Sequence, residues 1–485
     1  MTPTLSSSLS EDFISHAKKH FLNEHEVDDF IQACKRPLRK SIRINTLKIT
    51  VEDGLKKLQN YGLKFEAIPW CDQGFWVEIE HAYEKNFSLG NTVEHLQGLF
   101  YIQEASSMLP PFALHGGKVS HLESPMILDL AASPGSKTTQ LAAMVENRGL
   151  ILANELSASR VKVLHANLLR CGVSNTCMTQ FDGRKLGERL SGRFDLVLLD
   201  APCGGEGTVR KDPDALKNWQ LSKVEEISKL QKELILTAYQ CLKPGGRLVY
   251  STCTLSPEEN QQVAKHLLEQ CDAVVSDLSS LFKGAQRAVT KEGFLHVLPH
   301  IYDSEGFFVA AFSKPDITRV KLYSANQSNL FSSMDKKTYQ RILHYYQSHF
   351  GIDLSSLDLQ MKRRDKEVWL FPKGFDDICN LVKLNRSGIK VAEIYPNRIR
   401  STHEFFSCFA ELISRQKIQL SLEQVEDFYK GRNLEVSEKM IQDYGVDQGE
   451  VLLTFGGHFI GFGGMKKNKV KNQLPRALVK DQIKL

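Results

Sequence analysis

Between residues 125 and 313 the sequence alternates regularly between short apolar runs and longer stretches with helical periodicity. Strands alternating with helices form a parallel, doubly wound sheet, so we predict an α/β fold with a Rossmann-like central domain. The apolar runs predict strands, the last one in a terminal hairpin, over residues 126–132, 149–155, 176–181, 194–200, 246–252 and 306–313. The stretches between them predict helices over residues 136–146, 157–171, 217–242 and 257–270. Ser256 before Pro257, with Glu259 three residues after it, marks the start of the last helix.

The segments on either side of this region lack the alternation. The N-terminal part is a mixed region with two helical patterns and two strand-like pieces, over residues 10–21, 26–34, 41–45 and 74–79. The C-terminal part has a helical pattern near 335–349, a strand-like piece at 367–371 and a glycine-rich end at 455–464. Glycines clustered between aromatic residues fit the tight turns and bulges of a small β-barrel. We therefore predict three domains, over residues 1–120, 121–314 and 315–485.

The composition is that of a soluble globular protein, with 42% hydrophobic and 25% charged residues. No apolar run approaches the roughly 18 residues of a membrane span, and the start of the chain lacks the features of a signal peptide. We therefore expect a cytoplasmic protein with no membrane partner. The 10 cysteines form no CxxC pair and no zinc-like cluster, so we expect no metal site.

The net charge of +5 is concentrated in two segments. Residues 465–485 contain seven lysines or arginines and one aspartate, which leaves the other 464 residues at about −1. Residues 35–48 contain six basic residues and no acidic one. Each segment alone fits a solvated surface, but together with the site chemistry they favour nucleic acid as the partner.

Two of the cysteines stand where a predicted strand runs out into a loop. Cys203 follows Asp200-Ala201-Pro202 after the strand at 194–200, and Cys253 follows Ser251-Thr252 after the strand at 246–252. Ligands and catalytic groups of open α/β sheets gather at the carboxyl ends of strands. We therefore expect both thiols to face one crevice, whereas the other eight cysteines fit small apolar core residues.

The turn between the first predicted strand and its helix suits a nucleotide-like cofactor. Its small residues let a ligand approach the backbone, and the following helix presents free amide groups. The turn is neither a P-loop nor a GxGxxG fingerprint. The candidate cofactor-binding residues of this turn are Ala131, Ala132, Ser133, Pro134, Gly135, Ser136 and Lys137.

Acidic residues end the next three predicted strands. Glu155, 20 residues after Gly135, is placed to hold ribose hydroxyl groups. Asp182 ends the third strand and Asp200 the fourth. Each acid alone fits a cap or turn residue, but the series favours binding of the hydroxyl and amino groups of an adenosine.

A cofactor turn beside two thiols suits covalent chemistry on a base. Carbon 5 of cytosine is a weak nucleophile, and a thiolate that adds to carbon 6 enables it to attack an electrophilic methyl group. This reaction needs a reactive cysteine, a neighbour that stabilises charge on the ring, and a base for the carbon-5 proton. Cys253 and Cys203 are the candidate thiols, and Asp200 and Lys137 are the candidate ring partners. A sulfonium cofactor would supply the methyl group.

Three motifs resemble the signature of the NOL1/NOP2/Sun family of RNA cytosine-5 methyltransferases. They are the turn at 131–138, Asp200-Ala201-Pro202-Cys203 and Ser251-Thr252-Cys253-Thr254. The likeness extends over most of the chain. Residues 96–110 resemble the segment that precedes the catalytic domain in that family, and the glycine-rich end with Leu474-Pro475-Arg476 is similar to a PUA-like ending.

The resemblance implies S-adenosyl-L-methionine as the cofactor and a role for each motif. Cys253 would be the attacking nucleophile, and Cys203 would assist release of the methylated RNA. The turn, Glu155, Asp182 and Asp200 would bind the cofactor, with Asp200 and Lys137 also near the target base. The implied substrate is a cytosine of 16S ribosomal RNA near the decoding centre, within the 30S subunit. We expect the enzyme to be a monomer.

Other functions stay open on the sequence alone. Transfer RNA or large-subunit RNA could be the substrate, because substrate choice depends on the flanking domains. A non-catalytic RNA-binding assembly factor would not need the Cys, Asp and Lys set. A nicotinamide-dependent dehydrogenase would leave the two thiols unexplained and lacks its glycine fingerprint. A DNA cytosine methyltransferase would carry Glu-Asn-Val, which this chain lacks.

Several other residues favour a structural interpretation. His296 and His300 flank Pro299, which disfavours a helical metal pair and predicts surface or cap histidines. Glu258-Glu259-Asn260 predicts helix capping rather than catalysis. Trp219 opens a helical region and fits the core. The aromatic residues that could stack on bases but fit a core better are Tyr61, Trp70, Phe75 and Trp76.

Overall fold

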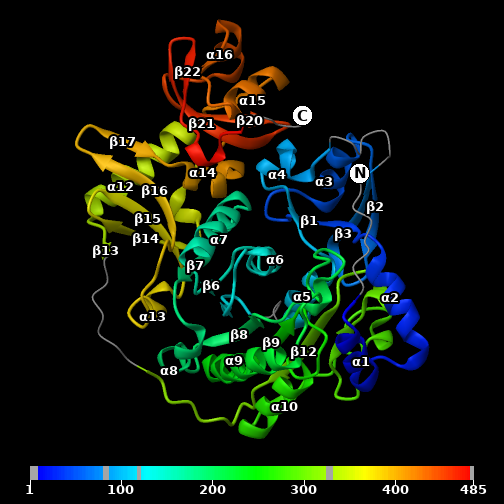
Figure 1. Cartoon of the computed structure of the whole chain (residues 1–485). Coiled ribbons are helices and arrows are strands. Elements are labelled where there is room, and N and C mark those ends of the chain that lie inside the picture. The colour runs from blue at the N-terminus through cyan, green and yellow to red at the C-terminus, as the bar shows by residue number, and fades with distance from the viewer. Residues whose placement is uncertain (1–8, 80–86, 117–121, 324–330, 481–485) are drawn as a thin grey trace.

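The computed structural model describes residues 9–79, 87–116, 122–323 and 331–480. These residues form four β-sheets with helices packed around them (Figure 1). An eight-stranded sheet forms the centre, a four-stranded sheet precedes it in the chain, and two five-stranded sheets follow. No helix in the described part of the chain is long and apolar enough to cross a membrane.

The central sheet confirms the predicted doubly wound fold. Its parallel strands follow the order β9-β8-β5-β6-β7. Their bounds are Met126–Asp129 for β5, Leu150–Asn154 for β6, Thr176–Thr179 for β7, Phe194–Asp200 for β8 and Leu242–Thr252 for β9. The strand order reverses between β5 and β8, and ligands of such sheets bind beyond the carboxyl ends at this switch point.

One edge of the central sheet is antiparallel. β12 (Phe307–Ser313) pairs antiparallel with β9, with Val309 opposite Ser251. β11 (Leu295–Val297) and β10 (Val274–Val275) both pair with β12. The predicted terminal hairpin is thus present as β11 and β12, and β12 brings the residues before Phe307 to the carboxyl edge of the parallel strands.

Helices cover both faces of the central sheet. Those packed on one face are α5 (Leu109–His115), α6 (Ser136–Met144) and α7 (Ala158–Arg170). Those on the other face are α8 (Gly187–Leu190), α9 (Leu221–Cys241) and α10 (Gln261–Gln270). Neighbouring strand residues point to opposite faces, since Ile127 belongs to the first core and Leu128 to the second. Burial on both faces explains why the strands are continuous apolar runs.

The start of α10 differs from the predicted one. The helix begins at Gln261, and residues 257–260 form turns instead of its first turn. The predicted cap residues have other partners: Ser256 Oγ donates to Glu206 Oε1 at 2.6 Å, and Glu259 Oε2 accepts the Gly204 N–H at 2.9 Å. The interpretation of Glu259 as a capping residue is therefore wrong, because long-range hydrogen bonds compete with the local cap.

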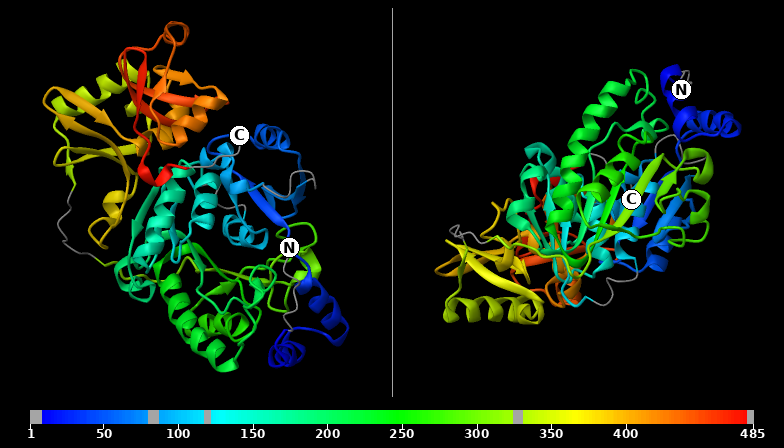
Figure 2. Two further views of the ribbon diagram at one scale, coloured as in Figure 1. Left: turned by 45° about the horizontal axis from the view of Figure 1, so that its top comes forward. Right: turned by 90° about the horizontal axis from the view of Figure 1, so that it is seen from below.

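The N-terminal region forms an antiparallel sheet of order β2-β3-β1-β4. Its strands are β1 (Lys40–Ile44), β2 (Leu63–Ile68), β3 (Cys71–Ile79) and β4 (Phe100–Ile102), and its longer helices are α1 (Glu11–His20), α2 (Val27–Lys35) and α3 (Val51–Gln59). Trp70 and Trp76 are buried, as the core interpretation of these aromatic residues predicts. In both views of Figure 2 this blue region and the yellow elements of the C-terminal part lie on different sides of the central sheet.

The C-terminal part contains two sheets. The first sheet has the order β13-β14-β15-β16-β17, and it begins with the short strand β13 (Ser332–Ser333). Its elements include β14 (Leu359–Arg364), β15 (Glu367–Pro372), β16 (Ile389–Tyr395), β17 (Arg398–Ser401) and, beside them, α12 (Lys336–Tyr345) and α14 (His403–Phe409). The second has the order β18-β20-β21-β22-β19, from β18 (Lys417–Gln419), β19 (Leu434–Glu435), β20 (Gly449–Phe455), β21 (His458–Lys466) and β22 (Lys469–Asn472).

The glycine-rich stretch is the hairpin between β20 and β21. Gly456 and Gly457 make its turn with φ of +57° and +86°, which glycine adopts without steric cost. The basic segment that follows this hairpin begins as part of the folded sheet rather than as a solvated tail. Lys469–Asn472 is a strand of the last sheet, and Val470 within it is fully buried.

Candidate active site

Cys203 and Cys253 meet at the carboxyl edge of the central sheet. Cys253 directly follows β9, Cys203 lies in the loop after β8, and their Sγ atoms are 3.2 Å apart. Both side chains are half-buried. The structure thus brings together the two thiols that the sequence singled out.

The environment of the two thiols favours one negative charge rather than two. The hydrogen bond with Cys253, burial, and the charges of Cys253, Glu259 and Asp200 raise the pKa of Cys203 well above its usual value. The two sulfurs share one hydrogen bond, in which either can be the donor.

An ion pair lies next to the thiols. Lys137 Nζ is 2.7 Å from Asp200 Oδ2, and it also donates to Ser107 Oγ at 2.8 Å. The other carboxylate oxygen of Asp200 accepts from Ser251 Oγ at 2.8 Å. Lys137 is 7% exposed, so these contacts hold its ammonium group in one place. Lys137 and Asp200, the two predicted ring partners, therefore form an ion pair, and Asp200 is also hydrogen-bonded to β9, the strand directly before Cys253.

The turn between β5 and α6 leaves room for a ligand to reach the backbone. Gly135 has φ of +105°, and the Ser133–Pro134 peptide bond is cis. α6 begins directly afterwards at Ser136, so the free amide groups of its first turn face the loop. Below the turn, Thr138 Oγ1 donates to Asp129 Oδ2 at 2.6 Å, and burial raises the pKa of Asp129 to about 7. Small residues, free amides and a nearby acid together fit an adenosine-bearing cofactor.

Glu155 and Asp182 follow β6 and β7, as predicted, and both carboxylates have local partners. Glu155 accepts the Ser157 N–H at 2.8 Å and pairs with Arg160 at 3.5 Å. Asp182 caps the next turn and pairs with Arg184 at 2.7 Å, and the hydrogen bonds from Arg184 lower the pKa of Asp182. These contacts orient each acid at its strand end, and a role toward the cofactor stays a prediction.

Glu259 supports the loop that carries Cys203, although its sequence context indicated only a cap. Its Oε2 accepts the Gly204 N–H at 2.9 Å and Gln231 Nε2 at 2.7 Å. Burial and the charge of Glu206 raise the pKa of Glu259 to about 7. A Cβ at Gly204 would lie 2.7 Å from Glu259 Oε1, so a larger residue there would require the glutamate side chain to shift.

Glu206 joins the two cysteine loops and was not predicted as a site residue. It is 1% exposed and accepts hydrogen bonds from both loops. Its donors are the N–H groups of Leu255 (2.9 Å) and Ser256 (2.7 Å), the hydroxyls of Thr254 (2.8 Å) and Ser256 (2.6 Å), and Trp219 Nε1 (2.6 Å). No local sequence pattern identifies this residue, because its partners lie 13 to 50 positions away.

Replacing Glu206 with alanine should lower the free energy of unfolding by about 3–5 kcal/mol, because several buried donors lose their acceptor together. Urea unfolding followed by circular dichroism measures the change. Glu188→Ala, at an exposed position of α8, is the matched control and should stay within about 0.5 kcal/mol of the unmodified protein. Equal stability of the two variants would contradict the role of Glu206 as the link between the loops.

The basic segment at 35–48 is only partly available to a polyanion. Arg43 is 3% exposed and donates to Ser136 O and Thr139 Oγ1, both at 2.8 Å, at the start of α6. Lys48 donates to Gln97 O at 2.9 Å, and burial lowers the pKa of both cations. The expectation of a polyanion contact is therefore wrong for Arg43, whose guanidinium forms structural hydrogen bonds instead.

The histidines also differ from expectation. His296 is 7% exposed, so the predicted surface or cap position is wrong for it, and burial lowers its pKa to about 4. Among the described residues, one group has metal-ligating atoms within 4.8 Å of one another, namely His16, His20 and Glu258. His16 and Glu258 already hydrogen-bond to each other at 3.1 Å and tie α1 to the turn before α10.

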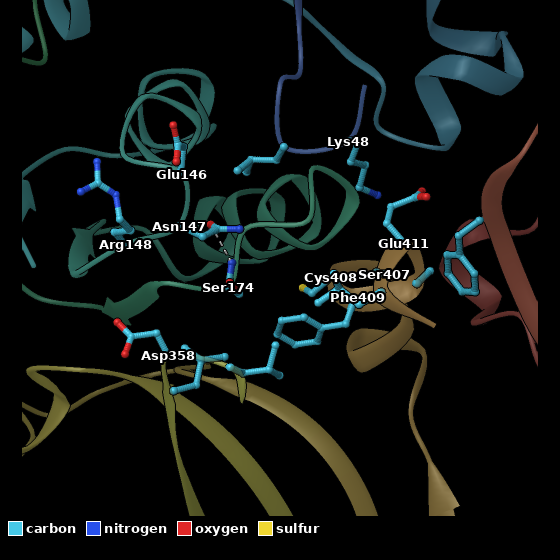
Figure 3. A pocket seen from close by; sticks show the side chains of 16 residues that line it. Lys48, Glu146, Asn147, Arg148, Ser174, Asp358, Ser407, Cys408, Phe409 and Glu411 are labelled. Atoms are coloured by element: carbon cyan, nitrogen blue, oxygen red, sulfur yellow. Dashed lines mark hydrogen bonds between the residues drawn. The ribbon is translucent and has the colours of Figure 1, made fainter. Parts of the chain in front are cut away.

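The structure has a pocket of about 330 Å³ in a different part of the molecule from the cofactor turn (Figure 3). Lys48 lines it from the N-terminal region, Asn147 and Arg148 from the loop after α6, and Asp358 and Phe409 from the C-terminal part. No residue of the cofactor turn and neither site cysteine lines it. The pocket marks where three parts of the chain meet and is separate from the cysteine site.

The fold and the site together define a class. A Rossmann-like methyltransferase has a doubly wound sheet, a cofactor turn after the first strand of that sheet, and a reactive group at the neighbouring strand ends. Four family models match successive parts of the chain and extend the assignment. They are the N-terminal domain of 16S rRNA methyltransferase RsmF (residues 9–105), 16S rRNA methyltransferase RsmB/F (119–313), the pre-PUA domain of ribosomal RNA small subunit methyltransferase F (331–408) and the methyltransferase RsmF PUA domain (415–480).

Curated relatives match almost the whole chain. Ribosomal RNA small subunit methyltransferase F of Shewanella loihica is 47% identical over 479 residues, covering 98% of this chain and 96% of the relative. The protein of the same name from Vibrio atlanticus is 46% identical over 478 residues, covering 98% of each. The chain therefore belongs to the ribosomal RNA small subunit methyltransferase F family. It is an RNA methyltransferase with S-adenosylmethionine as its cofactor, which excludes the dehydrogenase alternative.

Solved structures share about two thirds of the chain's fold. A methyltransferase homologue from Pyrococcus horikoshii is 32% identical with a TM-score of 0.54, and the match covers 65% of this chain and 100% of that one. NSun6 from Pyrococcus horikoshii has a TM-score of 0.56 at 24% identity, covering 64% of this chain and 99% of that one, and shows the shared fold alone. The PUA domain at the end of this chain matches the predicted PUA-like barrel.

Proposed function

We propose that this enzyme methylates carbon 5 of a cytosine in 16S ribosomal RNA near the decoding centre, within the 30S subunit and as a monomer. The observation that carries the proposal is the 3.2 Å contact between two thiols beside the Lys137–Asp200 ion pair. A carbon-5 methylation needs a sulfur nucleophile, a charge-stabilising pair at the ring and a second group for release. All of these groups stand at one sheet edge.

We also propose that the chain divides into its N-terminal, methyltransferase and C-terminal domains at residues 120 and 314.

The proposed reaction begins with the Cys253 thiolate. Its sulfur forms a bond to carbon 6 of the unstacked cytosine, and the electron pair moves into the ring. Asp200 and Lys137 face the polar edge of the ring and stabilise the charge that develops there. The turn from Ala131 to Lys137, with Glu155 and Asp182, would hold S-adenosylmethionine, whose sulfonium would give its methyl group to carbon 5 and leave as S-adenosylhomocysteine.

We assign the release step to Cys203. A base must take the proton from carbon 5, and the electron pair of that bond then expels the Cys253 sulfur from carbon 6. Before attack, the hydrogen bond with Cys253 and its charge help to raise the pKa of Cys203. Both causes disappear when Cys253 becomes a thioether, so Cys203 can lose its proton to solvent and act as the base. The pair thus divides attack and release between two neighbouring sulfurs.

The test is to incubate the protein with labelled S-adenosylmethionine and either 30S particles or free ribosomal RNA, and then to map the methyl group. A 5-methylcytosine in 16S RNA of the 30S particle is expected. Label at another atom or base would contradict the chemistry. Label only in free RNA, transfer RNA or large-subunit RNA would contradict the proposed substrate.

The hairpin between β21 and β22 is the part of the basic C-terminal segment that we expect to contact phosphates. Truncation before it would remove a core strand, so point substitutions are the appropriate test. Replacing the exposed Lys466, Lys467 and Lys471 with glutamine should weaken RNA binding and lower the slope of log affinity against log salt by about 2–3. Filter binding at several salt concentrations measures the slope. The same change at exposed Lys223, Lys229 and Lys265 is the control, and equal slopes for both triple variants would contradict the phosphate role.

A further inference from the structure

Lys137 is held at the site by a chain of hydrogen bonds that begins at Glu104. The lysine donates to Ser107 Oγ at 2.8 Å, and the N–H of Ser107 donates to Glu104 Oε2 at 3.1 Å. Ser106 Oγ donates to the same carboxylate oxygen. Glu104 therefore fixes the backbone of the loop whose hydroxyl group contacts Lys137. That loop precedes the central domain and is not used in the mechanism above.

A second carboxyl group packs against Glu104. Glu305 is 5% exposed, and its own N–H donates to Glu104 Oε1 at 3.1 Å. The next residue, Gly306, donates its N–H to Gly207 O at 3.0 Å, and Gly207 donates to Cys253 O at 2.9 Å. Glu305 is thus tied through the backbone to the nucleophile. Within the described residues, Glu305 Oε1 is buried with no hydrogen-bond partner, and no ion pair compensates the side chain.

Charges from several elements face Glu305. Glu104 approaches from the loop after β4, Lys137 from α6, and Arg210 and Lys211 from the loop after β8. Arg210 is itself paired with Asp303 at 2.8 Å. Burial and the charge of Glu104 raise the pKa of Glu305 to about 8, against the opposing effect of the three cations. The surroundings of Glu305 therefore favour its uncharged form.

We propose that Glu104 is a positioning residue that orients Lys137 through Ser107, and that Glu305 preserves this arrangement only while its carboxyl group is uncharged. The inference rests on the proposed function, in which Lys137 acts at the target base. An ionised Glu305 would place a second negative charge against Glu104 and beside the Lys137–Asp200 pair. Repulsion would then displace Glu104 and the Ser107 loop, and the ammonium group would lose its fixed position.

A double-mutant cycle tests the route through Ser107. Glu104→Gln and Ser107→Ala should each lower the rate constant of single-turnover methyl transfer by about 10- to 100-fold, with unchanged affinity for S-adenosylhomocysteine. If Glu104 acts through Ser107, the double variant is no slower than the slower single variant. Multiplicative effects would overturn the inference. No transfer by the unmodified protein would instead overturn the proposed function, and this inference with it.

A pH series tests the protonation of Glu305. Glutamine imitates the uncharged carboxyl group at every pH, so the ratio of the Glu305→Gln rate constant to that of the unmodified protein should rise at least about tenfold between pH 7 and pH 9.5. Taking a ratio removes the effect of thiol ionisation, which both proteins share. Glu292→Gln, at an exposed position before β11, should give a constant ratio. A constant ratio for Glu305→Gln as well would overturn the inference.

Discussion

Replacing Cys253 with alanine is expected to abolish methyl transfer, with a loss of roughly 10⁴-fold or more, while cofactor binding persists. The reason is that carbon 5 of cytosine becomes nucleophilic only after a sulfur adds to carbon 6. Cys203 is not expected to replace Cys253, because it comes from the loop after β8 and is assigned to the release step rather than to attack on carbon 6. Transfer of labelled methyl groups to 30S particles measures the activity, and calorimetry with S-adenosylhomocysteine measures cofactor binding.

Cys271→Ala is the matched control for this variant. Cys271 is also half-buried but lies at the end of α10, on a different part of the domain from the thiol pair. Its substitution should leave methyl transfer within about twofold. Full activity of Cys253→Ala would show that another group attacks the base. Loss of cofactor binding in that variant would show that Cys253 supports the cofactor site instead.

Replacing Cys203 with alanine should trap the enzyme on its substrate. Attack by Cys253 and methyl transfer do not require Cys203, but removal of the carbon-5 proton does, so the methylated RNA stays bound to Cys253. We expect a protein–RNA band that survives denaturing electrophoresis, together with turnover lowered by about 10²- to 10³-fold. The band should contain both the labelled RNA and the labelled methyl group.

The double variant with alanine at both cysteines is the control for trapping. It should form no band, since the sulfur that makes the covalent bond is absent. A band in the double variant would mean that another residue attacks the RNA. Normal turnover of Cys203→Ala without a band would mean that Cys203 has a structural role only.

The central sheet and the positions of its reactive residues could be predicted from local patterns. Strands buried on both faces are continuous apolar runs, so β8 was predicted with its observed bounds, 194–200. The end of each such strand gave the positions of Asp200, Cys203 and Cys253. The hairpin of the last sheet was also predictable, because Gly456 and Gly457 mark its turn.

The supporting residues could not be predicted, because their partners are distant in the sequence. Glu206 and Glu259 resemble ordinary loop and cap residues, and only the folded structure shows that they accept hydrogen bonds from the two cysteine loops. Arg43 was counted as surface charge, yet its guanidinium is buried at the start of α6. The sequence around Arg43 does not reveal this burial, because the acceptor is the carbonyl oxygen of Ser136, 93 residues later in the chain. Charge counts along a chain do not separate such cations from exposed ones.

The antiparallel edge strand β12 affects when the site can form during synthesis. A ribosome releases Cys203 and Cys253 well before it releases residues 307–313, which pair with β9. Gly306, which directly precedes that strand, makes the backbone contact to Gly207, and Gly207 in turn contacts Cys253. The nascent chain therefore carries both thiols through an interval in which the loop that orients them is incomplete. Methylation competence thus arises late, when the last strand of the sheet has docked, and non-local pairing of this kind is slow relative to helix formation.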